Sequence, residues 1–260
     1  MVVMLGIDLG SRNVKIVQMQ DGLVINHALY DTIWFYRNYG ARLRSGLAWD
    51  LGELGFADDQ VIATGYGKIM VQMGQARQIP EIQAHVKGAV FQTGLHDFTL
   101  LDIGGQDTKV VKVREGRPVD FMTNDRCAAS SGRYLENMSV VLGMSVEELS
   151  SYSKAPVELN ATCAIFGESE IIARIVEGCS LEELAAGVNL SLYRRSASML
   201  QQMASELIVL SGGGALNKAL QEIIARETGR EVLRLPEPQL NGAIGCCVSG
   251  GMENAQNSEQ

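Results

Sequence analysis

The sequence lacks several patterns that commonly identify the chemistry of a protein. No two cysteines have the CxxC spacing, and no apolar run is long enough to form a membrane-spanning helix. Neither the P-loop pattern GxxxxGK followed by Ser or Thr nor the dinucleotide-binding pattern GxGxxG is present. The three histidines, His27, His85 and His96, are scattered and do not indicate a histidine metal site. These absences disfavour membrane proteins, P-loop nucleotidases and Rossmann dehydrogenases.

An excess of basic residues is also missing. The 22 Lys and Arg residues are outnumbered by 30 Asp and Glu residues, and the net charge of −8 argues against non-specific nucleic-acid binding. A content of 46% hydrophobic and 20% charged residues is typical of globular proteins, and 260 residues suffice for one large or two ordinary domains. Residues 1–7 have no basic flank and are interpreted as a buried strand, not a signal peptide. We therefore expect a cytoplasmic protein that binds neither nucleic acid nor a membrane.

Two of the five cysteines, Cys127 and Cys163, lie where helices are predicted to begin, each after residues that favour a helix N-cap. Thiolate metal sites usually need four ligands, and each of these segments provides one. A second copy of the chain, related by a two-fold axis, would complete the set. The pattern predicts a metal centre shared by a homodimer, with zinc as the alternative metal. The other cysteines, Cys179, Cys246 and Cys247, are interpreted as small buried apolar residues.

An internal repeat relates two parts of the chain. Asp8, Gly10, Lys15, Val17 and Gly22 recur at one constant spacing as Asp102, Gly104, Lys109, Val111 and Gly116. Each copy contains an apolar strand, a glycine turn after an aspartate, a second strand, and a turn into a third strand. The last turn is Asp21-Gly22 in one copy and Glu115-Gly116 in the other, and both suit a two-residue hairpin. Matching turn chemistry makes duplication a better explanation than coincidence between valine-rich strands.

The remaining segments complete two α/β lobes. Strands are predicted at residues 61–64, 207–210 and 232–235, and helices at residues 80–93, 133–142 and 171–176. Ser145 and Ser180 are predicted helix caps, and Glu168 and Glu170 are predicted in the first turn of the helix after Cys163. We expect a first lobe of residues 1–95 plus a final helix at 241–252, a second lobe of residues 96–240, and a disordered tail of residues 253–260.

Three glycine loops follow predicted strands, at Gly10, at Gly104-Gly105 and at Gly212-Gly213-Gly214. Glycine lets the backbone approach a phosphate without a Cβ in the way and leaves N–H groups free to bind oxyanions. Asp8 and Asp102, at strand ends, are placed to hold Mg²⁺ beside the phosphates, usually through water. Lys15 could add positive charge. Together these loops predict a nucleotide site.

These segments resemble known proteins. The stretches Asp8-Leu9-Gly10-Ser11, Asp102-Ile103-Gly104-Gly105 and Ser211-Gly212-Gly213-Gly214 resemble the two phosphate motifs and the adenosine motif of the actin, heat-shock-protein and sugar-kinase superfamily. Residues 103–109, 124–129 and 162–170 resemble the activator of 2-hydroxyglutaryl-CoA dehydratase and the ATPase subunits of benzoyl-CoA reductase. The resemblance covers nearly the whole chain apart from the polar tail. One departure is Ser130-Ser131, where the family usually has Gly-Thr.

The resemblance implies an α/β protein with the duplicated actin-like ATPase fold, related to ribonuclease H, with a nucleotide cleft between two lobes. It implies that ATP or ADP and Mg²⁺ bind there, with Asp8 and Asp102 as catalytic residues. It also implies one [4Fe-4S] cluster per homodimer, ligated by Cys127 and Cys163 of each subunit. The residues expected to contact the nucleotide are Gly10, Ser11, Arg12, Asn13, Val14, Lys15, Gly104, Gly105, Gln106, Gly212, Gly213, Gly214, Asn217 and Gln239.

The implied function is that of an ATP-dependent electron donor. Reduced ferredoxin or flavodoxin would supply the electron, and ATP hydrolysis would drive its transfer to a 2-hydroxyacyl-CoA dehydratase or related reductase with its own iron–sulfur clusters. A change in the angle between the lobes would reach the helices that follow Cys127 and Cys163. Two alternatives share the glycine loops. A small-molecule kinase of the amino-sugar or pantothenate type would need a substrate hydroxyl and a base but neither cysteine, and an actin-like scaffold would need no iron.

Overall fold

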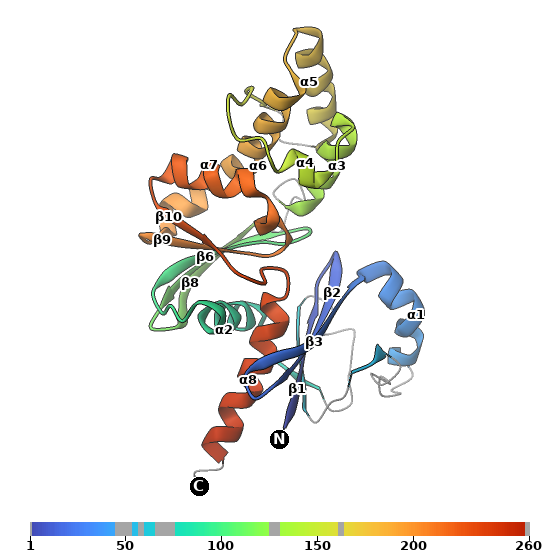
Figure 1. The fold of residues 1–260 in the computed structure, drawn as a ribbon, viewed down its shortest axis with the longest axis vertical. Coiled ribbons are helices and arrows are strands. Elements are labelled where there is room, and N and C mark those ends of the chain that lie inside the picture. The colour runs from blue at the N-terminus through green and yellow to red at the C-terminus, as the bar shows by residue number, and fades with distance from the viewer. Residues whose placement is uncertain are drawn as a thin grey trace. The chain divides into compact units, whose positions relative to one another are not determined.

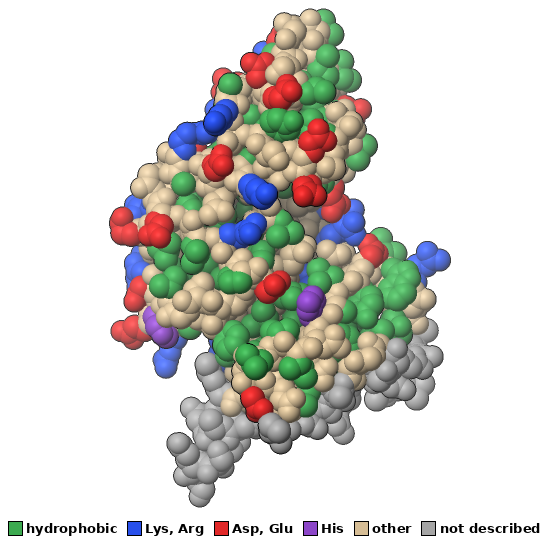
Figure 2. Space-filling view, viewed as in Figure 1, with side chains coloured by type: hydrophobic (Ala, Val, Ile, Leu, Met, Phe, Trp, Pro, Cys, Tyr) green, Lys and Arg blue, Asp and Glu red, His purple; other side chains and the backbone are tan. Residues whose placement is uncertain are grey.

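The structure, a computed structural model, describes residues 2–44, 54–56, 60–65, 76–124, 131–160 and 164–257. The chain divides into two compact units (Figure 1). The first contains Met1–His96, Val113–Pro118 and Gln239–Gln260, and the second contains Asp97–Lys112 and Val119–Pro238. Acidic and basic side chains are interspersed on the face shown in Figure 2. Among the described residues, none of the helices combines the length and the apolar character needed to cross a membrane.

The first unit is built on a five-stranded sheet with the strand order β3-β2-β1-β4-β5. Its strands are β1 (Val3–Leu9), β2 (Asn13–Gln20), β3 (Leu23–Asp31), β4 (Gln60–Thr64) and β5 (Arg77–Gln78). Its helices are α1 (Thr32–Arg44), α2 (Glu81–Thr93) and α8 (Asn241–Asn257). β1 pairs antiparallel with β2 and parallel with β4.

The second sheet has five strands in the order β10-β9-β6-β7-β8. They are β6 (Phe98–Ile103), β7 (Thr108–Arg114), β8 (Arg117–Asn124), β9 (Leu207–Ser211) and β10 (Glu231–Arg234). The accompanying helices are α3 (Gly132–Leu142), α4 (Val146–Leu149), α5 (Ala164–Val176), α6 (Leu181–Met203), the short 3₁₀ helix η4 (Gly213–Leu216) and α7 (Lys218–Thr228).

The internal duplication predicted from the sequence is confirmed. Read from the matching edge, β3-β2-β1-β4-β5 and β8-β7-β6-β9-β10 place every strand where its counterpart lies in the other sheet. The hairpin turns match as well, with φ of 49° at Asp21 and 78° at Gly22, and of 49° at Glu115 and 71° at Gly116. Positive φ at both central residues is the signature of a type I′ turn, which suits the twist of a hairpin.

β1 is buried on both faces, and its alternating side chains explain how α8 reaches the sheet. Leu5 and Ile7 belong to the apolar cluster that also contains Phe35 of α1. A Cβ added at Gly6 would lie on the opposite face of the sheet, within 2.0 Å of the Ala243 carbonyl oxygen of α8. Because successive strand residues alternate between faces, Asp8 lies on the α8 side. The N-terminal turn of α8 therefore lies close to the end of β1.

Gly245 allows α8 to pack directly on α2. A Cβ there would come within 1.8 Å of the Ala84 carbonyl oxygen, and backbone atoms cannot move aside cheaply. We expect Gly245→Ala to lower the free energy of unfolding by about 1–3 kcal/mol, as overpacked cores do. A methyl group added at Gly251 of the same helix would meet no atom within 4 Å, so Gly251→Ala should be neutral or slightly stabilising. Equal unfolding midpoints for both variants in a denaturant titration would contradict this account of the contact.

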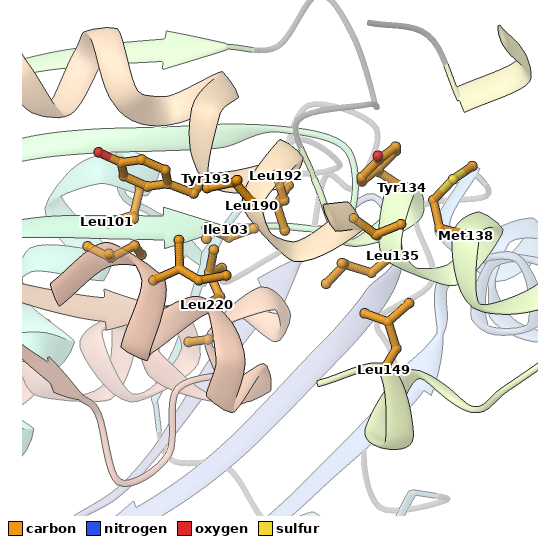
Figure 3. Packing of buried hydrophobic residues seen from close by; sticks show 14 of the residues in the cluster. Leu101, Ile103, Tyr134, Leu135, Met138, Leu149, Leu190, Leu192, Tyr193 and Leu220 are labelled. Atoms are coloured by element: carbon orange, nitrogen blue, oxygen red, sulfur yellow. The ribbon is translucent and has the colours of Figure 1, made fainter. Parts of the chain in front are cut away.

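The second unit has one large apolar core, part of which is shown in Figure 3. Tyr134, Leu135 and Met138 of α3 belong to it, together with Leu149 of α4. Residues of α6 and α7 join the same core, including Leu190 and Leu220 of Figure 3. α3 is therefore fixed along its apolar side from its first turn onward.

The predicted helix boundaries are largely confirmed. α3 ends before Gly143, whose φ of 67° is left-handed, and Ser180 forms a complete capping box with Glu183. Ser145 accepts a hydrogen bond from the Glu148 backbone N–H as predicted. At the C-terminus α8 extends to Asn257, five residues beyond the predicted end of the final helix at residue 252. Residues 252–256 are Met, Glu, Asn, Ala and Gln, most of which have a high intrinsic helix propensity.

Candidate functional site

The first candidate site lies at the turn between β1 and β2. The antiparallel register places Asp8 opposite Lys15, and Lys15 Nζ lies 2.9 Å from Asp8 Oδ2. The Asp8 side chain is 3% exposed and the Lys15 side chain 18%, so the ion pair is largely shielded from water. A Cβ at Gly10 would come within 2.7 Å of Lys15 Nζ, which places the ammonium group against the glycine loop. The lysine charge is thus held where a phosphate would approach this loop.

The first turn of α8 lies against the same carboxylate. A Cβ at Gly242 would come within 3.0 Å of Asp8 Oδ2 and 2.9 Å of His85 Nε2. Asn241 is buried, donates through Nδ2 to the His85 carbonyl oxygen at 2.9 Å, and accepts from Gln92 Nε2 at 3.0 Å. Helix N-termini carry partial positive charge, so α8 adds positive potential beside Asp8.

The first glycine loop is also bonded to the start of α1. Thr32 donates through Oγ1 to the Gly10 carbonyl oxygen at 2.8 Å, and through its backbone N–H to the Arg12 carbonyl oxygen at 3.1 Å. The Arg12 side chain forms an ion pair with Asp31, the last residue of β3. The Trp34 backbone N–H, together with Arg12, holds the pKa of Asp31 below its ordinary value. The loop is therefore shaped by the strand–helix junction that follows it.

The second unit repeats the aspartate–lysine arrangement. The Gly104 N–H donates to the Asp107 carbonyl oxygen at 2.9 Å and closes the turn. Lys109 Nζ lies 2.6 Å from Asp107 Oδ2 and 4.0 Å from Asp102 Oδ2, and its side chain is only 8% exposed. Asp107 and Lys109 were not predicted as site residues. The repeat, which aligns Lys109 with Lys15, was the available signal.

The start of α3 is bonded to the second glycine loop. Ser131 donates through Oγ to the Gly105 carbonyl oxygen at 2.8 Å. The Gly132 N–H donates to the Gly104 carbonyl oxygen at 2.9 Å, and the Arg133 N–H donates to the Gly105 carbonyl oxygen at 3.1 Å. The first backbone N–H groups of α3 are therefore bonded to the glycine loop that is expected to bind phosphate.

The third glycine loop lies beside Asp102. β9 pairs with β6 so that Ser211 is adjacent to Asp102, and Gly212 follows with φ of 81°. A Cβ at Gly212 would come within 2.9 Å of Asp102 Oδ1, so this position needs glycine. Gly65, after β4, is its counterpart in the first unit, with φ of 97° and a Cβ position 2.6 Å from the Leu9 carbonyl oxygen. Gly65 was not predicted, although a glycine directly after an apolar strand ending in a hydroxyl residue was a usable signal.

The other residues expected at the nucleotide occupy different environments. Val14 is buried in the first unit, so only its backbone can face a ligand. Asn217 is also buried, and its side chain caps α7 by accepting from the Leu220 N–H at 2.9 Å and donates to Asn189 Oδ1 at 2.8 Å. Half-buried residues are Ser11, Arg12, Asn13, Gly105 and Gln239, while Gln106 and Gly213 are exposed.

The predicted cluster ligands, Cys127 and Cys163, lie outside the residues that the structure describes. Cys246 and Cys247 of α8 are buried, as predicted, whereas Cys179, for which burial was also predicted, is only half-buried. Burial raises the pKa of the Cys246 thiol well above its ordinary value and that of Cys247 to about 12, so both stay protonated. Both side chains lie in the apolar cluster between α8 and the first sheet, where they act as small packing residues. Within the described ranges, no group of three or more His, Cys, Asp and Glu side chains could hold a metal ion.

Glu168 and Glu170 do not lie in the first turn of α5, and this prediction was wrong. α5 begins at Ala164, and its first turn contains no acidic residue. Both carboxylate oxygens of Glu170 instead accept the Asn160 backbone N–H, at 2.8 and 3.0 Å. Glu170 thus bridges from the second turn of α5 back to the chain that precedes residues 161–163. A contact of this kind depends on how the loop folds back and has no signature in residue spacing.

The fold and the site define a class of protein. Two sheets share one strand order, and each has a glycine turn after its central strand with an aspartate and a lysine beside it. Together with the similarity to solved activator structures, this is the duplicated actin-like ATPase fold, as predicted.

The chain belongs to the BadF/BadG/BcrA/BcrD ATPase family, which matches residues 5–250, and it is an ATPase. It is 35% identical over 205 residues to the 2-hydroxyisocaproyl-CoA dehydratase activator of Clostridioides difficile, covering 76% of each chain. The solved activator of the 2-hydroxyisocaproyl-CoA dehydratase from Clostridium difficile with bound ADPNP has a TM-score of 0.85 and 31% identity, covering 99% of this chain and 97% of that chain. Component A of the Acidaminococcus fermentans (R)-2-hydroxyglutaryl-CoA dehydratase has a TM-score of 0.86 and 30% identity, covering 98% of this chain and 100% of that one. The resemblance stated from the sequence is confirmed.

Proposed function

We propose that this chain is an ATP-dependent activator that donates electrons to a 2-hydroxyacyl-CoA dehydratase or a related reductase with its own iron–sulfur clusters. The observation that carries the proposal is the duplicated aspartate–lysine glycine turn, in a chain similar to activators of acyl-CoA dehydratases. The similar activator solved with ADPNP supports a nucleotide as the ligand of these turns.

The described residues suit phosphoryl transfer. Backbone N–H groups of the glycine loops and the ammonium groups of Lys15 and Lys109 would meet the phosphate oxygens. Asp8 and Asp102 would hold Mg²⁺, mainly through water, and orient the attacking water. The protein itself performs little covalent chemistry in this reaction. Most of the catalysis therefore comes from the positions of these charged groups around the phosphates.

We propose that Cys127 and Cys163 of two subunits ligate one [4Fe-4S] cluster per homodimer. The family-like sequence around both cysteines supports this, as does the packing of Cys246 and Cys247 inside the apolar cluster of the first unit. When bound, such a cluster supplies one-electron chemistry at a potential set by its surroundings, with reduced ferredoxin or flavodoxin as the electron source. Cysteines that ligate a cluster must stay out of disulfides, which fits a reducing compartment, so we also propose a cytoplasmic location.

The surface of α5 supports the homodimer. Ile172, Ile175 and Val176 are exposed at spacings that place them on one face of α5. α5 begins at the residue after Cys163, so the helix that carries this apolar face directly follows a proposed cluster ligand in the sequence. Exposed apolar stripes of this kind commonly mark protein contacts. We propose that the stripe packs against the second subunit.

Ile175→Glu should weaken the dimer. Ile175 is 46% exposed, and a carboxylate buried in an apolar contact without a partner carries a large desolvation penalty. We expect dimerisation weaker by roughly tenfold or more, measured by light scattering on an anaerobic sizing column. The matched control is Ile33→Glu on α1, where Ile33 is 64% exposed in the first unit, and it should leave the dimer intact. A dimer of unchanged strength in Ile175→Glu would exclude the α5 stripe as the subunit contact.

The function itself is tested by adding ATP and a reductant to the anaerobically purified protein together with a candidate dehydratase. We expect the dehydratase to become active only when ATP, the reductant and this protein are all present. A colourless, iron-free protein that transfers phosphate from ATP to a small sugar or pantothenate would instead favour the kinase. An iron-free protein without any transfer activity would favour the scaffold.

A further inference from the structure

The two copies of the repeat differ at the junction between the third strand and the helix that follows it. In the first unit, α1 begins at Thr32, directly after β3 ends at Asp31. In the second unit, residues 125–131 separate the end of β8 at Asn124 from the start of α3 at Gly132. Cys127 belongs to this additional segment, which has no counterpart in the first unit. The duplication therefore isolates the cysteine segment as an insertion between a strand and its helix.

Both junctions nevertheless use the same contact. The Thr32 hydroxyl donates to the Gly10 carbonyl oxygen in the first glycine loop, at 2.8 Å. The Ser131 hydroxyl donates to the Gly105 carbonyl oxygen in the second, also at 2.8 Å. The insertion thus leaves the helix start bonded to its glycine loop and adds chain only before it.

Ser131 does not play the role that serine usually plays before a helix. It is the N-cap residue of α3 with extended backbone angles, yet its side chain accepts no hydrogen bond from the helix. An unbonded helix start normally leaves its first N–H groups to water or a capping side chain. Here Gly132 and Arg133 give theirs to the carbonyl oxygens of Gly104 and Gly105. Ser131 is 0% exposed, so a shift of the loop without α3 would break the buried hydrogen bond from Ser131 to Gly105.

The opposite side of α3 is held firmly. Tyr134, in the first turn, is buried, and the Arg195 guanidinium carbon lies 4.0 Å from the centre of its ring. Burial raises the pKa of Tyr134, which therefore remains a neutral packing residue. The first turn of α3 is consequently a rigid piece between the core and the glycine loop. If the glycine loop at Gly104 and Gly105 moves, the residue that it displaces is therefore Ser131, directly before the first turn of α3.

We propose that Ser131 is a positioning residue through which the nucleotide bound at Gly104 and Gly105 sets the end of the Cys127 segment. β8 fixes the other end of the segment at Asn124, so moving Ser131 changes the distance that residues 125–130 must span. The placement of the nucleotide at this loop and the consequence for the metal centre both rest on the proposed function, whereas the coupling between loop and segment does not require a metal centre. Such coupling means that the segment is held differently when ADP is bound and when ATP is bound. This difference can be measured without the partner enzyme.

The test is hydrogen exchange by mass spectrometry on the full chain, saturated with ADP or with a non-hydrolysable ATP analogue. In the wild type we expect exchange in a peptide covering residues 124–134 to differ by roughly fivefold or more between the two nucleotides. Ser131→Ala should lower this ratio to about half or less, because only the backbone bonds from Gly132 and Arg133 then remain. Ser131→Thr, which keeps the hydroxyl, should restore it. The matched control is Ser139→Ala, because Ser139 is a buried serine of the same helix whose hydroxyl donates to the Glu136 carbonyl oxygen. It should keep the wild-type ratio.

A Ser131→Ala protein that keeps the wild-type ratio overturns the proposal, and so does a wild type without any nucleotide-dependent exchange in this peptide. A Ser131→Thr protein that behaves like Ser131→Ala also overturns it, because the hydroxyl would then not be the coupling group. The iron content of the same wild-type preparation is measured separately. An iron-free protein would end the proposed electron-donor function, while the exchange ratios would still decide the role of Ser131.

Discussion

Replacing Cys127 by Ala is expected to abolish the iron–sulfur chromophore. In the proposed centre, each subunit contributes two thiolates, so the variant dimer would retain only the pair from Cys163. Four thiolates hold a [4Fe-4S] cluster, and half of that set cannot keep it. The wild type purified without oxygen should be brown, absorb near ~400 nm and contain about four irons per dimer, whereas the variant should be colourless.

Cys179→Ala is the matched control, because Cys179 is a half-buried cysteine of the second unit outside both cysteine motifs. It should keep its colour and its iron. Full iron content in Cys127→Ala, with the protein folded by circular dichroism, would remove Cys127 from the ligand set. Equal loss in Cys179→Ala would show that the assignment of ligands is wrong.

Asp8→Asn is the second change with a large expected effect. The carboxylate is buried, lies 2.9 Å from Lys15 Nζ, and is the group proposed to hold Mg²⁺. The amide keeps the shape but removes the charge that both cations need. We expect ATP hydrolysis to fall by roughly 100-fold or more, the range seen when a charge-stabilising group is removed from an active site. The measurement is phosphate release at saturating ATP and Mg²⁺. Asp102→Asn should act in the same direction.

The control for Asp8 is Asp21→Asn. Asp21 lies in the β2–β3 hairpin with φ of 49°, a conformation that asparagine adopts readily, so the turn should persist. The corresponding control for Asp102 is Asp120→Asn on β8, where the Asp120 carboxylate accepts the Phe121 N–H. Both controls should hydrolyse ATP at the wild-type rate. If Asp8→Asn did so too, the first glycine loop would not be part of the catalytic site.

Local chemistry explains which parts of the fold could be predicted. The Asp21-Gly22 and Glu115-Gly116 turns both require positive φ, and matching turn residues at a constant spacing revealed the duplication. Ser180 with Glu183, and Gly143 after α3, are caps whose partners lie within one turn of helix. Turns and caps of this kind depend only on residues close together in the sequence, so they can be predicted without knowing the fold.

The rest depends on contacts between distant residues. Nothing in the spacing around Ser131 or Glu170 shows that one bonds Gly105 and the other Asn160. Asn217, predicted to contact the nucleotide, also caps α7 and bonds Asn189 of α6, and only the second of these contacts lies beyond the range of local sequence signals. The aspartate–lysine pairs fall between these cases. Lys15 lies opposite Asp8 only once the strand register is set, but the repeat could have transferred that role to Lys109.

The central claim is that two subunits share one redox centre. Sedimentation velocity of the anaerobically purified protein, recorded at 280 nm and near ~400 nm, tests it in one measurement. We predict a single dimeric boundary at both wavelengths, with the visible absorbance moving entirely with the dimer. A visible chromophore that sediments with monomers, or a dimer without one, would contradict a cluster held between the two subunits.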